Sequence, residues 1–280
     1  RKAEHILEIR ELVESLGGDQ ILIAKIENEE GLKNSEAILE AADGIMVARG
    51  DLGVEVPPEE VPLIQKYLIE LCNNAGKPVI TATEMLESMV RNPRPTRAEI
   101  TNVAHAIMDG ADAVMLSAET AVGKFPVAAV QIMSKVAECT EAALNYEEIL
   151  AKKRIGASPT VADAISHATC QTAQDLKAAA IITSTQSGST ARMVSKYRPQ
   201  ATIVAVTPSP RVANQLTISW GVNPVLAPAA GNIDEMFDVS IKGAKEAGDI
   251  NANDLVVITA GVRTGVPGST NLLQVLTAPE

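Results

Sequence analysis

Ionisable side chains follow a short apolar run near the start of the chain. Residues 21–27 read ILIAKIE, so that Lys25 and Glu27 stand two positions apart. Side chains two apart on a strand point to the same face, so we expect an ammonium and a carboxylate to emerge together at the carboxyl end of a strand buried on both faces. Burial of a charged pair at that position costs free energy of desolvation unless a ligand or a reaction uses the charges. The pair therefore indicates a reactive site.

A second run of the same kind, GIMVARGD at residues 44–51, ends in Asp51. Its Gly50 lets the backbone approach a ligand closely. Glu27 and Asp51 are hard oxygen ligands of the kind that Mg²⁺ accepts, since this ion keeps several waters and takes further ligands from the substrate. The alternative is a Lys25–Glu27 ion pair that only holds the strand ends. We favour it less, because the next strand also ends in a reactive group.

That next strand, VITAT, ends in Thr83. By strand alternation Thr83 shares a face with Thr81 and Val79, and we expect its hydroxyl to point into the same mouth as Lys25. A hydroxyl is a poor acid by itself, so the expected role is positioning and proton relay rather than general acid catalysis. A lone threonine on a strand would otherwise indicate only β-propensity.

These side chains need strands whose carboxyl ends meet at one edge. Apolar strands alternate with amphipathic helices in this part of the chain, which predicts a parallel sheet. The expected strands lie near residues 21–27, 44–49, 77–83 and 112–117. Four βα units are half of an eight-unit barrel, a fold that places its chemistry at the carboxyl ends of its strands. We therefore predict an α/β fold with a partial TIM (β/α) barrel over residues 1–150.

A polar connector, AKKRIGASP at residues 151–159, separates this region from a second one. The alternation restarts with a helix near 160–176. Further strands are expected near residues 179–183, 202–207, 223–227, 255–260 and 271–277. We predict a smaller α/β C-terminal domain over residues 160–280.

Composition narrows the class of protein. The net charge of −11 argues against a nucleic-acid or membrane-surface partner, because no basic patch survives that balance. The three cysteines, Cys72, Cys139 and Cys170, have no metal-ligand spacing, which favours reduced thiols over a disulfide framework. With no membrane-spanning run and no signal peptide, a cytoplasmic protein is the expectation.

Five segments together resemble the pyruvate kinase family in order and spacing: KIENEEGL (25–32), GIMVARGDLGVEVP (44–57), GKPVITATEML (76–86), NPRPTRAE (92–99) and DAVMLSAET (112–120). The resemblance implies phosphoryl transfer from phosphoenolpyruvate to ADP, giving pyruvate and ATP in the last step of glycolysis. It makes the four βα units the last four of the barrel, and the second domain a regulatory one. The first half of the barrel and its lid would lie outside these 280 residues, so we expect the fragment alone to be inactive.

The resemblance also implies roles for the charged residues. Lys25 would stabilise the transferring phosphoryl group and the enolate oxygen, which is an electrostatic form of catalysis. Glu27 and Asp51 would bind the divalent metal, Mg²⁺ or Mn²⁺. Members of the family also use K⁺, whose ligands we expect in the missing N-terminal part.

Two further groups of site residues follow from the resemblance. Backbone amides of Arg49, Gly50 and Asp51 would receive the substrate carboxylate, and Thr83 would help to place the substrate and the proton added to the enolate. Ser117 and Glu119 would join a solvent relay near the same mouth. The chain departs from the family there, with LSAET in place of the usual LSGET and Glu84 where a glutamine is common.

In the second domain, hydroxyl-rich residues 183–190 join a strand to a helix. Hydroxyls and backbone amides that converge at a helix N-terminus can bind phosphate, whereas the alternative is a capping loop without ligand. By resemblance this is an effector loop for a sugar phosphate or a nucleotide, and the same resemblance implies a homotetramer. The expected effector residues are Thr185, Ser187, Gly188, Ser189, Thr190 and Arg263.

Two other functions stay open at this point. A metal-dependent lyase or aldolase acting on pyruvate-like substrates would also use a Glu/Asp metal pair on barrel strands, but it would show no nucleotide dependence. A non-catalytic sugar-phosphate-binding module would bind its ligand through residues 185–190 and would tolerate the loss of Lys25.

Overall fold

The computed structural model describes residues 1–153, 160–261 and 270–280. The chain divides into two compact units, Arg1–Leu144 and Asn145–Glu280. Most of the expected connector lies outside the described residues. Helix α9 (Tyr146–Lys152) belongs to the second unit, because its Leu150 is buried in a cluster with Cys170 and Tyr197 of that unit. The first unit therefore ends before residue 150, the end expected from the sequence.

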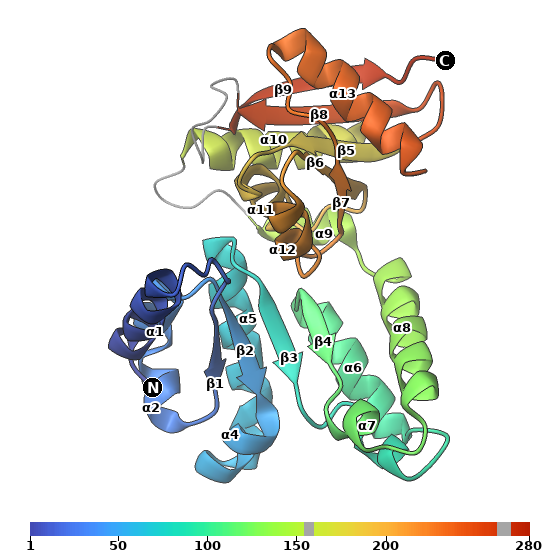
Figure 1. The fold of residues 1–280 in the computed structure, drawn as a ribbon. Coiled ribbons are helices and arrows are strands. Elements are labelled where there is room, and N and C mark those ends of the chain that lie inside the picture. The colour runs from blue at the N-terminus through green and yellow to red at the C-terminus, as the bar shows by residue number, and fades with distance from the viewer. Residues whose placement is uncertain (154–159, 262–269) are drawn as a thin grey trace. The chain divides into compact units, whose positions relative to one another are not determined.

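The first unit holds a four-stranded sheet in the order β1-β2-β3-β4, and every neighbouring pair is parallel (Figure 1). Its strands are β1 (Ile23–Ile26), β2 (Gly44–Ala48), β3 (Val79–Ala82) and β4 (Ala113–Met115). Its helices are α1 (Ala3–Ser15), α2 (Glu29–Lys33), α3 (Ser35–Ala41), α4 (Arg49–Glu55), α5 (Val61–Ala75), α6 (Arg97–Asp109), α7 (Ala118–Ala121) and α8 (Pro126–Ala142), with 3-10 helices η1 (Pro58–Glu60) and η2 (Glu87–Val90). The predicted parallel α/β arrangement is confirmed.

Local signals in the sequence fix where these helices begin and end. Helix α6 starts with a capping box, in which Thr96 and Glu99 each accept a hydrogen bond from the other's backbone amide. Helix α5 ends at Gly76, whose φ of 66° suits a residue without a side chain. The C-terminal ends of the helices determine where the following strands start.

The two faces of the first sheet are buried to different extents. Ile26 of β1 lies beside Val47 of β2, and both are buried. Lys25 lies beside Met46, which in turn lies beside Ile80 of β3, and this face is partly exposed. The expectation that β1 is buried on both faces is therefore wrong. Its side chains alternate between a buried face and a partly exposed face. The helices of the described chain cover only the Ile26 face.

The second unit holds a five-stranded sheet in the order β7-β6-β5-β8-β9, in which only the β8–β9 pair is antiparallel. Its strands are β5 (Ala180–Ser184), β6 (Thr202–Thr207), β7 (Val222–Leu226), β8 (Leu255–Gly261) and β9 (Thr270–Thr277). Besides α9 it contains α10 (Val161–Asp175), α11 (Ser189–Ser195), α12 (Pro210–Leu216) and α13 (Ile233–Glu246). All five strands lie where the sequence predicts them.

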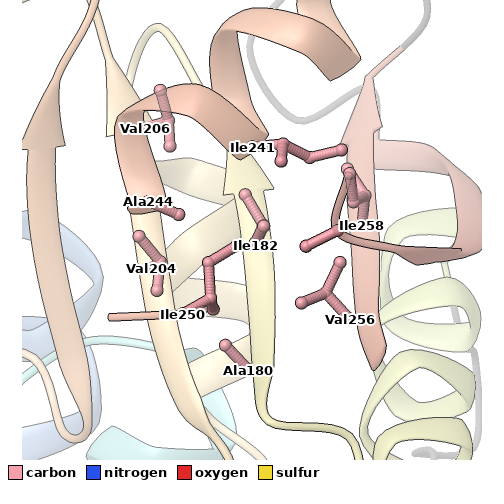
Figure 2. Packing of buried hydrophobic residues seen from close by; sticks show 10 residues of the cluster. Ala180, Ile182, Val204, Val206, Ile241, Ala244, Ile250, Val256 and Ile258 are labelled. Atoms are coloured by element: carbon pink, nitrogen blue, oxygen red, sulfur yellow. The ribbon is translucent and has the colours of Figure 1, made fainter. Parts of the chain in front are cut away.

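The second sheet is buried on both faces. On one face Ile241 and Ala244 of α13 pack against Ile182 and Val204 (Figure 2). On the other face, side chains of α9, α10 and α11 pack against Ile181 and its neighbours. The continuous apolar runs of β5 and β6 reflect this two-sided burial.

Two further predictions concern the state of the cysteines and the presence of membrane-spanning segments. Cys72 and Cys170 are buried and Cys139 is exposed, and all three are free thiols. Within the described ranges no helix is long and apolar enough to cross a membrane.

Candidate active site

The carboxyl ends of β1 and β2 bring three ionised groups into contact. The ammonium of Lys25 lies 2.5 Å from Oε2 of Glu27 and 2.7 Å from Oδ2 of Asp51. The three side chains are 47%, 42% and 52% exposed, respectively. The structure thus brings together the lysine and the two predicted metal ligands in a place that a ligand can reach.

These contacts change the proton affinities of the groups. Hydrogen bonds to Asp51 and Glu27 raise the pKa of the Lys25 ammonium above its ordinary value. The same hydrogen bond from Lys25 lowers the pKa of the Asp51 carboxyl. Both shifts favour the charged forms of Lys25 and Asp51, and the formal charges of the cluster are one positive and two negative.

The two carboxylates suit a divalent cation that needs few protein ligands. In the part of the chain that the structure describes, no group of three or more His, Cys, Asp or Glu side chains could hold a metal ion by itself. Mg²⁺ needs no such cage, because it keeps several waters and accepts one or two carboxylates. Glu27 and Asp51 therefore fit Mg²⁺ or Mn²⁺ better than a metal bound entirely by the protein.

Thr83 lies beside this ionic cluster, one residue after β3 ends. Its Oγ1 accepts a hydrogen bond of 2.7 Å from the Gly50 amide and donates one of 2.6 Å to the Ala82 carbonyl. Gly50 directly precedes Asp51, so the hydroxyl is placed against the backbone that carries a predicted metal ligand. The predicted neighbourhood of Thr83 and Asp51 is observed.

The expected reason for that neighbourhood was wrong. Val79 and Thr81 lie beside buried residues of β2 and are themselves buried, on the face opposite to Lys25. A continued strand would have directed Thr83 into the same buried layer. Instead the backbone leaves the strand, with φ of 66° at Thr83 and 53° at Glu84. Such left-handed conformations cost non-glycine residues about 1–3 kcal/mol each.

Arg49 is buried under this turn rather than presented to solvent. Its Nη2 donates to the Thr83 carbonyl at 2.7 Å and to the Glu84 carbonyl at 3.0 Å. Burial lowers the pKa of the guanidinium, although arginine stays charged at neutral pH. Of the backbone amides expected to receive a substrate carboxylate, that of Gly50 already donates to Thr83.

Glu119, expected in a solvent relay, is 1% exposed. Its Oε1 accepts from the Leu86 amide at 3.0 Å, and its Oε2 accepts from the Ser117 amide at 2.8 Å. Both carboxyl oxygens of Glu119 therefore accept hydrogen bonds from backbone amides. Ser117 lies at the start of α7, so the carboxylate ties the segment after β4 to the segment after β3.

One buried polar residue was missed in the sequence. Gln65 of α5 is 4% exposed, accepts from Nη1 of Arg49 at 3.3 Å and donates to Oδ2 of Asp109 at 2.7 Å. It shares the buried side of α5 with Ile64 and Leu68. A glutamine within an apolar stripe is the signal that would have revealed it.

In the second unit, the loop after β5 uses its polar groups on itself. Oγ1 of Thr185 accepts from the Gly188 amide at 3.0 Å. Oγ of Ser187 accepts from the Ser189 amide at 3.4 Å. Two amides that could have received a phosphate are thus directed at side chains of the same loop, as the capping alternative requires.

Of the two remaining predicted effector residues, the structure describes one. Thr190 is buried, and its hydroxyl lies 2.8 Å from the hydroxyl of Thr270. Arg263 lies outside the described residues. Arg192 of α11, which the sequence analysis did not single out, lies beside the loop and donates from Nη2 to the Ser187 carbonyl at 2.9 Å.

Family comparisons match the chain in two parts. A model described as the barrel domain of pyruvate kinase matches residues 1–130. A model described as the alpha/beta domain of pyruvate kinase matches residues 163–276. The two matches fall in the two structural units.

Curated relatives extend this similarity along almost the whole chain. The chain is 54% identical over 276 residues to a pyruvate kinase of Clostridium acetobutylicum, covering 98% of the chain and 58% of that protein. It is 56% identical to a pyruvate kinase of Geobacillus stearothermophilus, covering 98% of the chain and 47% of that protein. The chain thus spans about half the length of the curated relatives it matches.

Proposed function

The chain belongs to the pyruvate kinase family, and from that premise we propose that it forms part of an enzyme that transfers a phosphoryl group from phosphoenolpyruvate to ADP. The products are pyruvate and ATP, and one proton is consumed when the enolate becomes the ketone. The observation that supports the proposal most directly is the contact of Lys25 with both Glu27 and Asp51.

The charges of this cluster agree with such a substrate. Two carboxylates and one ammonium sum to −1, which would repel the phosphate and carboxylate of phosphoenolpyruvate. A divalent cation reverses that sign, and it supplies charge neutralisation on the oxygens of the transferred group. We propose Glu27 and Asp51 as its ligands, because both offer hard oxygens at one mouth.

Lys25 is proposed to stabilise negative charge on the phosphoryl and enolate oxygens. Its ammonium is kept protonated by its carboxylate partners, so it serves as a fixed positive charge and not as a base. The Asp51 and Arg49 amides remain proposed donors to the substrate carboxylate, while the Gly50 amide supports Thr83.

Thr83 is proposed to place the substrate and to relay the proton to the enolate carbon. Its hydroxyl proton is directed to the Ala82 carbonyl, and its oxygen accepts from Gly50, so its orientation is determined from both sides. In a relay the hydroxyl would turn its proton from the Ala82 carbonyl to the enolate carbon and accept a replacement proton, while the Gly50 amide keeps the oxygen in place. Ser117 remains a proposed relay member, whereas the contacts of Glu119 support a different role.

The remaining properties are proposed from family membership. We propose that β1–β4 are the last four strands of an eight-stranded barrel, since β1 and β4 are the outer strands of the described sheet. We propose a regulatory second domain at residues 160–280, a homotetramer, a cytoplasmic location, a sugar-phosphate or nucleotide effector, and K⁺ bound outside this chain. The 280 residues alone are then expected to lack turnover.

The test is a coupled pyruvate-formation assay on this chain extended at its N-terminus to the length of its relatives. Pyruvate should form only with phosphoenolpyruvate, ADP and Mg²⁺ together. Formation of pyruvate without ADP would favour the lyase alternative. A folded extended chain without activity would reject the proposal, and full activity of the 280-residue chain would reject the claim that it is a fragment.

A further inference from the structure

We infer that Arg49 and Glu119 are positioning residues, which hold the turn after β3 so that the Thr83 hydroxyl stays on the Gly50 amide. We call residues 83–86 the β3 turn. This inference rests on the proposed function, because it explains how the proposed role of Thr83 is maintained. It assigns to the side chains of Arg49 and Glu119 an action on the protein backbone instead of on substrate or solvent.

The β3 turn has a backbone that it would not adopt by itself. Thr83 and Glu84 have φ of 66° and 53°, in the left-handed region. Neither is a glycine, and threonine is β-branched, so this conformation is strongly disfavoured for it. Two such residues in succession persist only if the surroundings hold them.

Arg49 holds the carbonyl side of the β3 turn. Its Nε and Nη2 donate to the Thr83 carbonyl at 3.2 and 2.7 Å, and Nη2 also donates to the Glu84 carbonyl at 3.0 Å. A planar guanidinium can bind both carbonyls at once, which an ammonium cannot do with the same geometry. Gln65 accepts a hydrogen bond from Nη1 of Arg49 and donates one to Asp109. It therefore holds the guanidinium nitrogen that does not contact the β3 turn.

Glu119 holds the other end of the β3 turn. It accepts from the Leu86 amide with one oxygen and from the Ser117 amide with the other. Leu86 is fully buried, and so is Met85 before it. The turn is therefore fixed to the α4 side by a buried guanidinium and to the α7 side by both oxygens of a buried glutamate.

The position of Thr83 depends on both attachments. Its hydroxyl reaches the Gly50 amide only because the chain turns sharply after Ala82. If either attachment is lost, the turn can relax toward negative φ and move the hydroxyl away from Gly50 and the neighbouring Asp51. An error of about 1 Å in the position of a catalytic group can lower a rate by about 100-fold.

The test is a double-mutant cycle in the extended chain with Arg49→Lys, Thr83→Val and the double variant. Arg49→Lys should lower kcat by about 10- to 100-fold and leave KM for phosphoenolpyruvate within about threefold. The double variant should be within about twofold of Thr83→Val alone, because Arg49 acts through Thr83.

Three results can be told apart. A rise of about tenfold or more in KM at unchanged kcat would show that the Arg49 guanidinium binds substrate, and would overturn the inference. Multiplicative effects in the cycle would overturn it as well, since Arg49 would then act independently of Thr83. An inactive but folded wild-type chain would reject the proposed function instead, without bearing on the attachments seen here.

Amide hydrogen exchange tests the attachments without any assay of activity. Glu119→Gln replaces one acceptor by a donor, so peptides containing Gly50 and Leu86 should exchange faster than in the wild type. Glu138→Gln, at an exposed glutamate of α8, is the matched control and should leave both peptides unchanged. Gln65→Met, which removes one contact of Arg49, serves if Arg49→Lys does not fold. Unchanged exchange at Gly50 in folded Glu119 and Gln65 variants would overturn the inference.

Discussion

The carboxyl ends of the two sheets both carry polar side chains, and the two ends differ in what those side chains contact. After β1 and β2, Lys25, Glu27 and Asp51 contact one another while remaining about half exposed. After β5, Thr185 and Ser187 accept hydrogen bonds from amides of their own loop. The comparison teaches that a polar loop at a strand end is a candidate ligand site only when its groups are still accessible.

The bodies of the sheets show the same contrast. The second sheet is packed on both faces, whereas the first is packed on one, and its other face carries Lys25. An ionised lysine in the middle of a fully covered sheet would carry a large desolvation cost. The partly covered sheet therefore permits the ionic site that the fully covered sheet excludes.

The largest expected effect comes from the exposed ionic cluster. In the extended chain, Lys25→Met should lower kcat by about 1000-fold, because a positive charge aimed at the transferring group is lost. Lys33→Met, at an exposed lysine that pairs with Glu29, is the matched control and should keep full activity. A Lys25→Met enzyme with more than a tenth of the wild-type kcat would contradict the proposed role.

The contrast in packing can be measured by truncation of one isoleucine in each sheet. Ile182→Ala, at a fully buried side chain of β5, should lower the free energy of unfolding by about 2–5 kcal/mol. Ile80→Ala, on the partly exposed face of β3, should cost less than about 1 kcal/mol in the 280-residue chain.

The Ile80→Ala substitution also tests the proposal that β1–β4 belong to an eight-stranded barrel. In the extended chain the cost of Ile80→Ala, measured by denaturant unfolding, should rise above about 2 kcal/mol, because the missing half of the barrel would cover that face. An unchanged cost in the extended chain would argue against barrel closure over β3.

A third prediction tests whether the loop after β5 is tightly packed. A side chain at Gly188 would meet Nη1 of Arg192 at 2.7 Å and Cδ2 of Leu216 at 3.1 Å, at a φ of +78°. Gly248 has a φ of +81° and open space around it. Gly188→Ala should therefore destabilise by about 2–3 kcal/mol, and Gly248→Ala by only about 1 kcal/mol. Equal urea midpoints of unfolding for the two variants would show that the loop accommodates a side chain at Gly188 and is not tightly packed.

The smallest effect concerns an ion pair of the second unit. Lys196 lies 2.8 Å from Asp163, and both side chains are mostly buried. Burial raises the pKa of Asp163, but hydrogen bonds from Lys196 and Thr160 outweigh it and hold the pKa below its ordinary value. The ionised carboxylate thus stabilises the fold above about pH 4, and that contribution is lost as the pH falls through the lowered pKa.

Asp163→Asn should therefore be less stable than the wild type at pH 7, by about 1 kcal/mol or less, and the two should converge near pH 2. Thermal unfolding across this range measures the difference, with Asp238→Asn at an exposed aspartate as the control. A difference that stays constant with pH would mean that the ion pair is not the cause.

Much of the fold could be predicted from the sequence, because strand and helix signals are local. Apolar runs predicted the strands, and the structure shows that Gly76 and the Thr96–Glu99 capping box are local signals at helix boundaries. The end of the first unit was less predictable. Helix α9 joins the second unit because Leu150 is buried in a cluster with later residues such as Cys170 and Tyr197, and no local pattern reveals that cluster.

The ionic cluster was also predictable, since Lys25 and Glu27 are two positions apart at the carboxyl end of β1 and Asp51 follows β2. The contacts of Arg49 and Glu119 were not. They depend on the left-handed backbone at Thr83 and Glu84, and neither residue type signals such a conformation. The relay role first expected for the Glu119 side chain assumed accessibility, which burial removes, whereas the role expected at Arg49 concerned its backbone amide.

The β3 turn has a consequence for protein engineering. Residues with positive φ are the usual targets for stabilisation by glycine, and Glu84→Gly would relieve a strained backbone. It would also remove the restriction that keeps this backbone in one geometry. A search for thermostable variants would thus select the substitution, while a search for catalytic speed would reject it.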